Sequence, residues 1–141
     1  MHTSQIAECD YGDPQSVVRA FIESMNSWEK FAHQLSREAE QCENWPEILR
    51  TQELVFSRFC TAKDRPSGRS GSFQNPPEYD PRSEIVVSSN IERKDRAHVE
   101  TDRVASLGGG RYRYTLHLHD GRWLIDNVKF DENGRWRPSI L

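Results

Sequence analysis

The stretch RYRYTLHLHDGRWLIDNVKF, Arg111 to Phe130, contains two runs of alternating apolar and polar residues on either side of an Asp-Gly pair. Alternation with a period of two residues is typical of a β-strand that buries one face. Asp120-Gly121 is a strong signal for a type I′ turn, because both residues accept the positive φ angles that this turn requires. The stretch therefore predicts a β-hairpin.

The two-residue turn also sets the register of the hairpin, since each position before the turn then lies opposite one position after it. The predicted pairs are His119 with Arg122, Leu118 with Trp123, His117 with Leu124, Leu116 with Ile125, Thr115 with Asp126, and Tyr114 with Asn127. The apolar layer contains Tyr112, Tyr114, Leu116, Leu118, Trp123 and Ile125, and the polar layer contains Arg113, Thr115, His117, His119, Arg122 and Asp126. We expect the apolar layer to face the core, because a shift of one residue would move its large side chains into water.

The length and composition of the chain limit the classes of protein to which it can belong. A chain of 141 residues has the size of one domain, which can bury a core without disulfide bonds or a metal. The formal net charge of −3 argues against general nucleic-acid binding, which requires a basic surface. No apolar run is long enough to cross a membrane, and the N-terminal residues lack the basic and apolar regions of a signal peptide. We therefore expect a cytosolic, single-domain protein that binds neither nucleic acid nor membranes.

A first amphipathic helix is predicted near the N-terminus. Asp13-Pro14 is typical of a helix start, and apolar residues recur at helical spacing from Val17 to Trp28. Asn26 and Glu29 have the spacing of a capping box, which would start a second helical segment toward Cys42. An uninterrupted, bent helix is the alternative, and the pattern does not separate the two.

A further helix is predicted to begin at Asn44. Asn44, Pro46 and Glu47 combine a cap, an early proline and the acidic residue of a capping box. Apolar positions then recur at helical spacing from Ile48 to Phe59. This start is the best-marked helix boundary in the sequence.

The segment from Lys63 to Arg82 is rich in Pro, Gly, Ser and charged residues, and we expect a long surface loop there. Further strands are predicted over residues 84–91, 96–104 and 135–141, and Asn133-Gly134 supplies a second turn. Helices followed by a run of antiparallel strands predict an α+β domain, in which the N-terminal helices pack on one face of a curved antiparallel sheet.

This order of elements resembles the nuclear transport factor 2-like (NTF2-like) cone fold. The closing residues DGRWLIDNVKFDENGRWRPSIL, Asp120 to Leu141, are similar to those of the NTF2-fold immunity proteins that protect bacteria from polymorphic toxins. The resemblance implies a single NTF2-like domain over residues 1–141. It also implies a protein that binds and neutralises a cognate bacterial toxin.

The sequence does not predict a metal or cofactor site. His117 and His119 share one strand face near Asp126, but further ligands are not evident, and a solvated polar face explains this pattern better. The three cysteines have no C-x-x-C spacing, so we expect reduced thiols rather than a zinc site or a disulfide framework.

Enzymes of the NTF2-like superfamily, such as ketosteroid isomerase, place carboxylates or histidines inside the cone. In the predicted hairpin Asp126 points outward, and the inward side chains include no base that works near neutral pH. His33 and Glu29 are interpreted as a surface pair at i,i+4 spacing on a helix. The alternative function is a SnoaL- or ketosteroid-isomerase-like enzyme, or a small-molecule-binding protein, that uses the cone cavity.

Three groups of side chains are candidate partner-binding sites. The first is an acidic cluster with a tryptophan, composed of Glu38, Glu40, Glu43, Trp45 and Glu47. The second is the aromatic and basic part of the long loop, composed of Arg69, Phe73 and Tyr79, a composition typical of binding hot spots. The third is the outer face of the hairpin, composed of Arg113, His117, His119 and Arg122. A homodimer through this outer sheet face is a further expectation.

The distribution of charge supports a binding function. The chain up to Ala62 holds ten acidic and five basic residues, whereas the remainder holds twelve acidic and fourteen basic residues. An acidic helical half can steer a basic partner during encounter. We therefore predict an immunity protein, not an enzyme, that occludes a cognate toxin protein.

Overall fold

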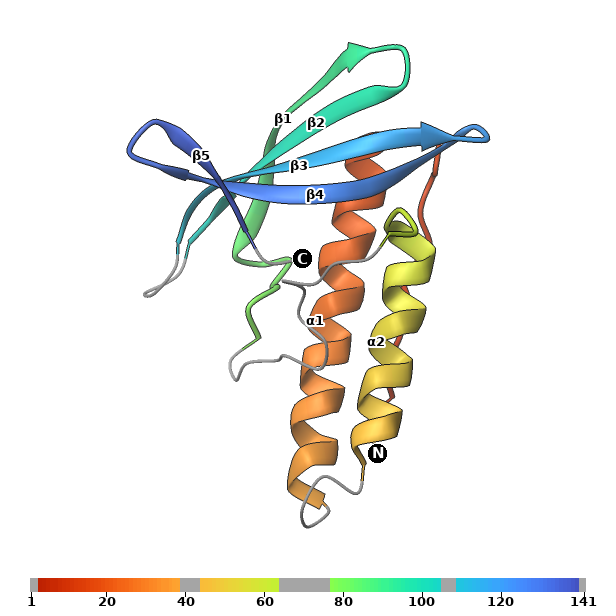
Figure 1. Ribbon diagram of the computed structural model, residues 1–141. Coiled ribbons are helices and arrows are strands. Elements are labelled where there is room, and N and C mark those ends of the chain that lie inside the picture. The colour runs from red at the N-terminus through yellow and green to blue at the C-terminus, as the bar shows by residue number, and fades with distance from the viewer. Residues whose placement is uncertain (1–2, 39–43, 64–76, 105–108, 140–141) are drawn as a thin grey trace.

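The structure, a computed structural model, describes residues 3–38, 44–63, 77–104 and 109–139 (Figure 1). Its elements are α1 (Pro14–Glu38), α2 (Trp45–Phe59), β1 (Glu84–Arg93), β2 (Arg96–Arg103), β3 (Gly110–His119), β4 (Arg122–Glu132) and β5 (Arg135–Pro138). The strands form one antiparallel sheet in the order β1-β2-β3-β4-β5, so each strand pairs with its neighbour in sequence. Both helices pack against one face of the curved sheet, which confirms the predicted α+β class.

Helix α1 runs without interruption from Pro14 to Glu38. A side-chain oxygen of Asp13 accepts a hydrogen bond from the backbone N–H of Gln15, as the predicted helix start requires. Asn26 and Glu29 do not restart a helix, because both side chains bind residues of the segment before β1 instead. The uninterrupted alternative is therefore the observed one.

Helix α2 begins where the sequence indicates but is capped differently. The Asn44 side chain makes no capping hydrogen bond, and its Nδ2 donates to the carbonyl of Leu35 on α1 at 2.9 Å. Glu47 forms an ion pair with Arg50 rather than reaching back to the start of the helix. The predicted capping box is therefore wrong, because a contact between the two helices takes the asparagine side chain.

The predicted hairpin is present, with Asp120 and Gly121 at φ angles of 50° and 76°. The four predicted pairs nearest the turn are confirmed, up to Leu116 with Ile125. Beyond them Thr115 pairs with Asn127 and Tyr114 with Val128, so the last two predicted pairs are wrong. The cause is a β-bulge, which inserts one extra residue at Asp126 and turns Val128 toward the core.

The core lies between the helices and the inner face of the sheet, which is the face that packs against them. Its largest fully buried apolar side chains include Phe21 and Trp28 of α1, Phe59 of α2, and Tyr114 of β3. Tyr112 and Leu118 of the predicted apolar layer are partly buried and pack against this core. Inside the core, the Trp28 indole Nε1 donates to the carbonyl of Ile48 at 3.1 Å, so the polar atom of this side chain has a partner.

Two further predictions concern parts of the chain next to the core. Most of the predicted loop between Lys63 and Arg82 lies outside the described residues, and its last part, residues 77–82, leads into β1. The last predicted strand is present as the four residues of β5. None of the helices in the described ranges combines the length and apolar composition that a membrane span requires.

Candidate partner-binding surfaces

The outer face of the sheet, which points away from the helices, is polar because strand residues alternate between the two faces. On β2 the buried residues Ala97, Val99, Thr101 and Arg103 alternate with the partly exposed residues Arg96, His98, Glu100 and Asp102. On β3 the residues opposite the second set are His117, Thr115, Arg113 and Arg111. The outer face therefore carries rows of charged side chains on neighbouring strands.

Most charged groups at the β4–β5 end of this face are paired. Arg111 Nε lies 2.5 Å from Asp102 Oδ1, and Arg113 Nη2 lies 3.0 Å from Glu100 Oε2. The guanidinium of Arg113 also lies 4.2 Å from the centre of the Trp136 ring on β5. Arg113 is thus held by a carboxylate and an aromatic ring, and its side chain is only 28% exposed.

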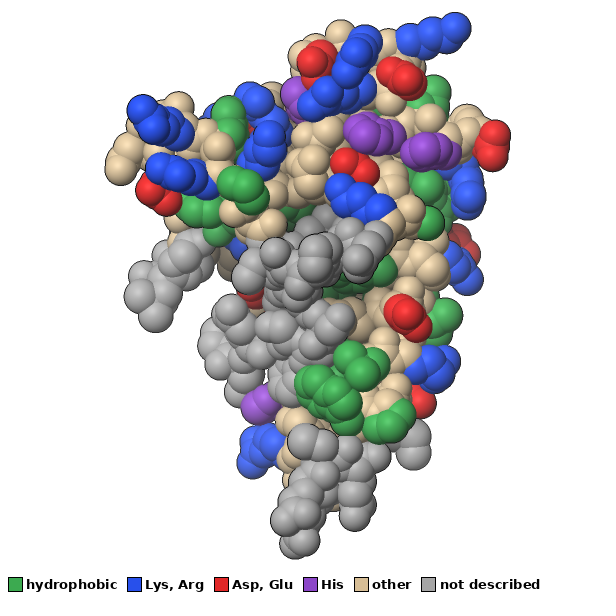
Figure 2. Space-filling model, in the orientation of Figure 1, with side chains coloured by type: hydrophobic (Ala, Val, Ile, Leu, Met, Phe, Trp, Pro, Cys, Tyr) green, Lys and Arg blue, Asp and Glu red, His purple; other side chains and the backbone are tan. Residues whose placement is uncertain are grey.

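His117, His119 and Arg122 lie at the other end of the outer face, beside the β3–β4 turn. Figure 2 shows two histidine side chains next to each other toward this side of the molecule. The His117 Nδ1 is 3.9 Å from Asp126 Oδ1, and the rings of the two histidines are 6.4 Å apart. The Arg122 guanidinium lies 5.4 Å from the ring of Tyr11. These side chains are accessible, and their contact with a partner stays a prediction.

Asp126, the extra residue of the β-bulge, has a side chain that is held in place by hydrogen bonds. It accepts hydrogen bonds from Thr61 Oγ1 at 2.8 Å and Lys63 Nζ at 3.1 Å. Burial alone would raise the pKa of Asp126, but these two donors and the nearby His117 hold it below its ordinary value. Across the described parts of the chain, no three His, Cys, Asp or Glu side chains gather in a way that could hold a metal ion.

The acidic cluster is only partly described. Glu40 and Glu43 lie outside the described residues, whereas Glu38 is exposed at the end of α1. Trp45 at the start of α2 is 37% exposed, and Figure 2 shows apolar side chains gathered beside the first turns of this helix. Of the predicted cluster, the structure thus describes Glu38 at the end of α1 and Trp45 and Glu47 in the first turn of α2.

The prediction for Tyr79 is wrong. We expected this side chain on the partner-binding loop, but it is only 1% exposed, and its ring packs edge-on against Phe21 at 5.4 Å. The reason is that residues 78–80 pass over α1 and close one side of the core. Arg69 and Phe73, the other predicted residues of this loop, lie outside the described residues.

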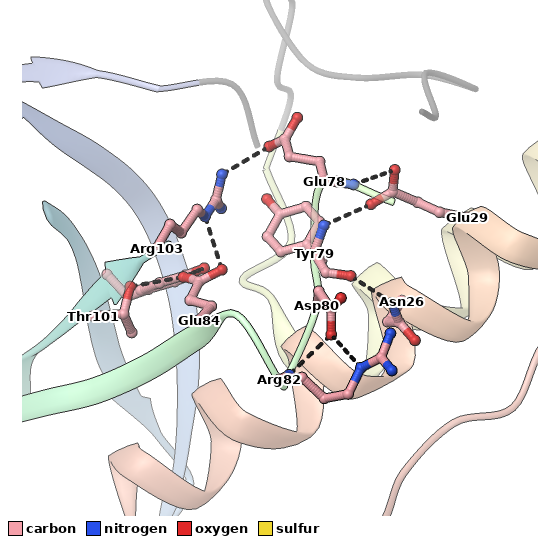
Figure 3. A network of polar contacts seen from close by, with 10 residues as sticks. Asn26, Glu29, Glu78, Tyr79, Asp80, Arg82, Glu84, Thr101 and Arg103 are labelled. Carbon is pink, nitrogen blue, oxygen red and sulfur yellow. Dashed lines mark hydrogen bonds and ion pairs between the residues drawn. The ribbon is translucent and has the colours of Figure 1, made fainter. Parts of the chain in front are cut away.

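The sequence analysis missed a buried polar network between α1, the segment before β1, and the sheet (Figure 3). At its centre, the Glu84 carboxylate accepts hydrogen bonds from Thr101 Oγ1 at 2.7 Å, the Tyr114 hydroxyl at 2.7 Å and Arg103 Nε at 2.8 Å. The side chains of Arg103 and Glu84 are 6% and 1% exposed, so this ion pair lies inside the protein.

Arg103 extends the network to residues 78 and 79. Its Nη1 lies 3.2 Å from Glu78 Oε2, and its guanidinium lies 3.8 Å and 4.9 Å from the ring centres of Tyr112 and Tyr79. Burial lowers the pKa of Arg103, but the surrounding tyrosines and Glu84 outweigh this effect and raise it. These contacts therefore favour the charged form of the guanidinium.

On the helical side, Glu29 of α1 fixes the same segment. Its carboxylate accepts the backbone N–H groups of Glu78 at 3.1 Å and Tyr79 at 3.0 Å, and Asn26 donates to the Tyr79 carbonyl at 2.8 Å. Glu29 is completely buried, so its interpretation as a surface partner of His33 is wrong. A buried carboxylate is needed here because the two N–H groups would otherwise lack partners.

The network lies on the inner side of the sheet, between the strands and α1. Glu84, Thr101 and Arg103 point inward, but each donor and acceptor named above is directed at another residue of the chain. One sequence signal could have found it, since alternation along β2 puts Thr101 and Arg103 on the same face as the core residue Val99. The inner side of the sheet is therefore occupied by side chains that bind one another.

The comparison with protein families shows to which family the chain belongs. The sequence model of the family described as NTF2 fold immunity protein matches residues 13–138, so the chain belongs to this family of immunity proteins, which are not enzymes. The chain is also 29% identical over 114 residues to the immunity protein RhsIA of Dickeya dadantii (strain 3937). This match covers 79% of the chain and 82% of the relative. No solved structure matches the chain significantly.

Proposed function

We propose that this immunity protein acts in the cytosol, where it binds a cognate bacterial toxin and neutralises it by occlusion. The observation that carries the proposal is the contrast between the two sides of the sheet. Inside, Glu84 and Arg103 are saturated by internal contacts, whereas outside, His117, His119 and Arg122 are accessible. Side chains that contact another protein must lie on the surface, as His117, His119 and Arg122 do.

Two of the described surfaces have features suited to such a partner. In the first turn of α2, Trp45 supplies an exposed aromatic anchor two positions before the carboxylate of Glu47. On the outer hairpin face, Arg113 is pre-ordered by Glu100 and Trp136, so that little conformational freedom is lost on binding. We assign the anchoring contact to Trp45, because an aromatic side chain is the commonest hot spot of an interface.

The experiment pairs Trp45→Ala with Leu54→Ala. Both are exposed apolar residues of α2, at 37% and 43%, and only Trp45 adjoins the acidic cluster. Each variant is co-expressed with the toxin encoded beside its gene, and toxin binding is measured by surface plasmon resonance. We expect Trp45→Ala to weaken binding about 30-fold through faster dissociation, since loss of an anchor costs about 2 kcal/mol.

The second variant is the control for loss of exposed apolar surface on α2. Leu54→Ala should leave both the affinity and the protection of cells unchanged. Equal, unchanged affinity of both variants would place the anchor elsewhere, and the outer hairpin face would be tested next. If the wild-type chain neither binds the toxin nor protects cells, occlusion itself is refuted.

A further inference from the structure

The strand β1 is exposed to an unusual degree for a sheet strand. Every residue from Val87 to Arg93 is exposed, so this part of the strand is open on both faces. Its exposed residues include Ile85 at 57%, Val87 at 43% and Ile91 at 58%, which are large apolar side chains. Among the large apolar side chains of the described residues, the most exposed is Val104, directly after β2, at 72%. Apolar surface is therefore concentrated at one edge of the sheet.

This edge also offers unpaired backbone groups. β1 is the first strand of the sheet and pairs with β2 alone, and its hairpin with β2 projects away from the helices (Figure 1). From Ile85 to Ile91 the strand has no charge and no proline, which are two of the means by which an edge strand avoids other strands, and of the protective features it has only β-bulges. An edge with both properties is suited to pairing with another strand.

We propose that β1 pairs with β1 of a second copy of this chain, antiparallel and about a two-fold axis near Ser89. Such an interface requires that residues at equal distances before and after the axis fit one another. Ile85 lies four positions before Ser89 and Arg93 lies four positions after it. Both point to the outer face, since their partners on β2 are Asp102 and Arg96. The aliphatic part of Arg93 would then cover Ile85 of the other copy.

Charges at the two ends of the edge lie at nearly equal distances from this axis. Arg82 lies seven positions before Ser89, and Asp95 lies six positions after it. The Arg82 side chain is 83% exposed, with its Nε 3.4 Å from Asp80 Oδ1. Asp95 is exposed in the β1–β2 turn, where its carbonyl accepts the N–H of Leu118. The two-fold axis brings Arg82 of each copy beside Asp95 of the other. This complementarity favours a second copy over an unrelated strand.

The two β-bulges of β1 bound the part of the strand that can pair regularly. One lies between Val86 and Ser88 and the other between Ile91 and Arg93, at two positions before and three positions after Ser89. Regular pairing that is symmetric about Ser89 is therefore confined to residues 88–90. The apolar and charged contacts on either side then fix the register.

The experiment measures the mass of the chain by sedimentation velocity, without toxin, from about 1 to about 200 μM. We expect the mass to rise from that of one chain to that of two. Arg82→Glu and Asp95→Arg should each weaken the association at least tenfold, because each places like charges together twice in the dimer. An equimolar mixture of these two variants should associate as the wild type does, since both contacts then join opposite charges again.

The control variant is Arg135→Glu on β5, the opposite edge of the sheet, which should leave the association unchanged. A chain that stays monomeric over the whole range overturns the proposal, as does a dimer that survives both charge reversals. A dimer lost on Trp136→Ala but not on the β1 variants would place the interface on the outer sheet face instead. Loss of toxin binding by the β1 variants without a change in mass would assign this edge to the toxin. Because the sedimentation assay contains no toxin, the results on mass do not depend on the proposed function, whereas the toxin-binding outcome does.

Discussion

At the scale of single residues, the buried ion pair of Glu84 and Arg103 dominates the structure. Its two charges are removed from water, which costs free energy that only good geometry and further hydrogen bonds can offset. Here Thr101 and Tyr114 occupy the remaining lone pairs of Glu84, and two aromatic rings flank Arg103. Each buried charge of the pair therefore depends on the other charge for its stabilisation.

The first prediction follows from this dependence. Arg103→Met should lower the free energy of unfolding by about 3–5 kcal/mol, because it leaves the Glu84 carboxylate buried without its cation. The double variant Glu84→Gln with Arg103→Met should lose less than the sum of the two single variants, since no unpaired charge remains. Urea denaturation checks both values, and strictly additive losses would contradict the account.

The second prediction concerns the pH dependence of stability. Burial, and then the nearby Glu84, raise the pKa of Tyr114 well above its ordinary value of 10.0. The unfolded chain therefore releases this proton before the folded protein does. The stabilisation is present below pH 10 and is lost as the pH rises from there toward the folded pKa. We expect the free energy of unfolding to fall above pH 10.

Two variants that remove one donor from Glu84 test this assignment. Tyr114→Phe should cost about 1–3 kcal/mol at neutral pH and reduce the alkaline fall, because the titrating group is gone. Thr101→Val removes a hydrogen bond of the same 2.7 Å length but keeps Tyr114, so its alkaline fall should match the wild type. Urea denaturation from neutral pH to about pH 11 measures both curves. An undiminished fall in Tyr114→Phe would mean that other groups cause it.

Residue-scale features were the hardest to predict from the sequence. Glu29 looks like any helix carboxylate, and only the path of residues 78 and 79 over α1 makes it a buried acceptor. Tyr79 has the composition of a loop hot spot, yet the same path buries it. Both depend on contacts between positions about fifty apart in the chain, which local patterns do not encode.

At the scale of elements, the β3–β4 hairpin was the most predictable part of the chain. The Asp120-Gly121 turn and the alternation of side chains both predict the same register, and four of the predicted pairs are present. The bulge at Asp126 was not predictable from alternation, because both readings keep the same residues near the turn buried. The effect of the bulge is that Val128, rather than Asn127, reaches the core.

The third prediction tests the faces of this hairpin with two tryptophans. Trp123 is 5% exposed on the inner face, and Trp123→Ala should cost about 3–5 kcal/mol as a large-to-small change in the core. Trp136 lies on the outer face against Arg113, so Trp136→Ala should cost much less. Thermal unfolding followed by circular dichroism compares them. Equal losses would contradict the assignment of the two faces.

The helices show where start signals suffice and where they do not. Asp13-Pro14 and Pro46 lie within a residue of the observed starts of α1 and α2. The capping boxes at Asn26 and Asn44 were wrong, because each asparagine side chain hydrogen-bonds a carbonyl outside its own helix start. A cap residue has several competing partners, and tertiary contacts decide among them.

At the scale of the whole molecule, the sequence predicted which half of the chain is acidic, but not which charged side chains pair with one another. The acidic helical half and the slightly basic sheet half follow directly from the positions of the charges. The pairing on the outer face does not, since Arg111 and Arg113 find carboxylates of β2 only once the sheet has formed. Of the three predicted groups, the outer hairpin face is described in full, and the other two only in part.

The fourth prediction concerns the charge of the helical half. Substitution of Glu38, Glu40, Glu43 and Glu47 by Gln should slow association with the toxin and make it less sensitive to salt, because charges at the rim act mainly on the encounter rate. The free energy of unfolding should hardly change. Binding kinetics at low and high salt provide the measurement. An unchanged association rate at low salt would show that this cluster does not steer the partner.

The buried network also determines the order in which the chain can assemble. Every strand pairs with its sequence neighbour, so the sheet grows from local hairpins, whereas the contacts of Glu29 with residues 78 and 79 span about fifty positions. The contacts of Glu29 should therefore form late, after the transition state for folding, whereas the Glu84–Arg103 ion pair lies within the local β1–β2 hairpin. Stopped-flow measurements should show that Glu29→Gln refolds at nearly the wild-type rate and unfolds much faster. The contacts of Glu29 thus set how long the folded immunity protein persists rather than how quickly it forms.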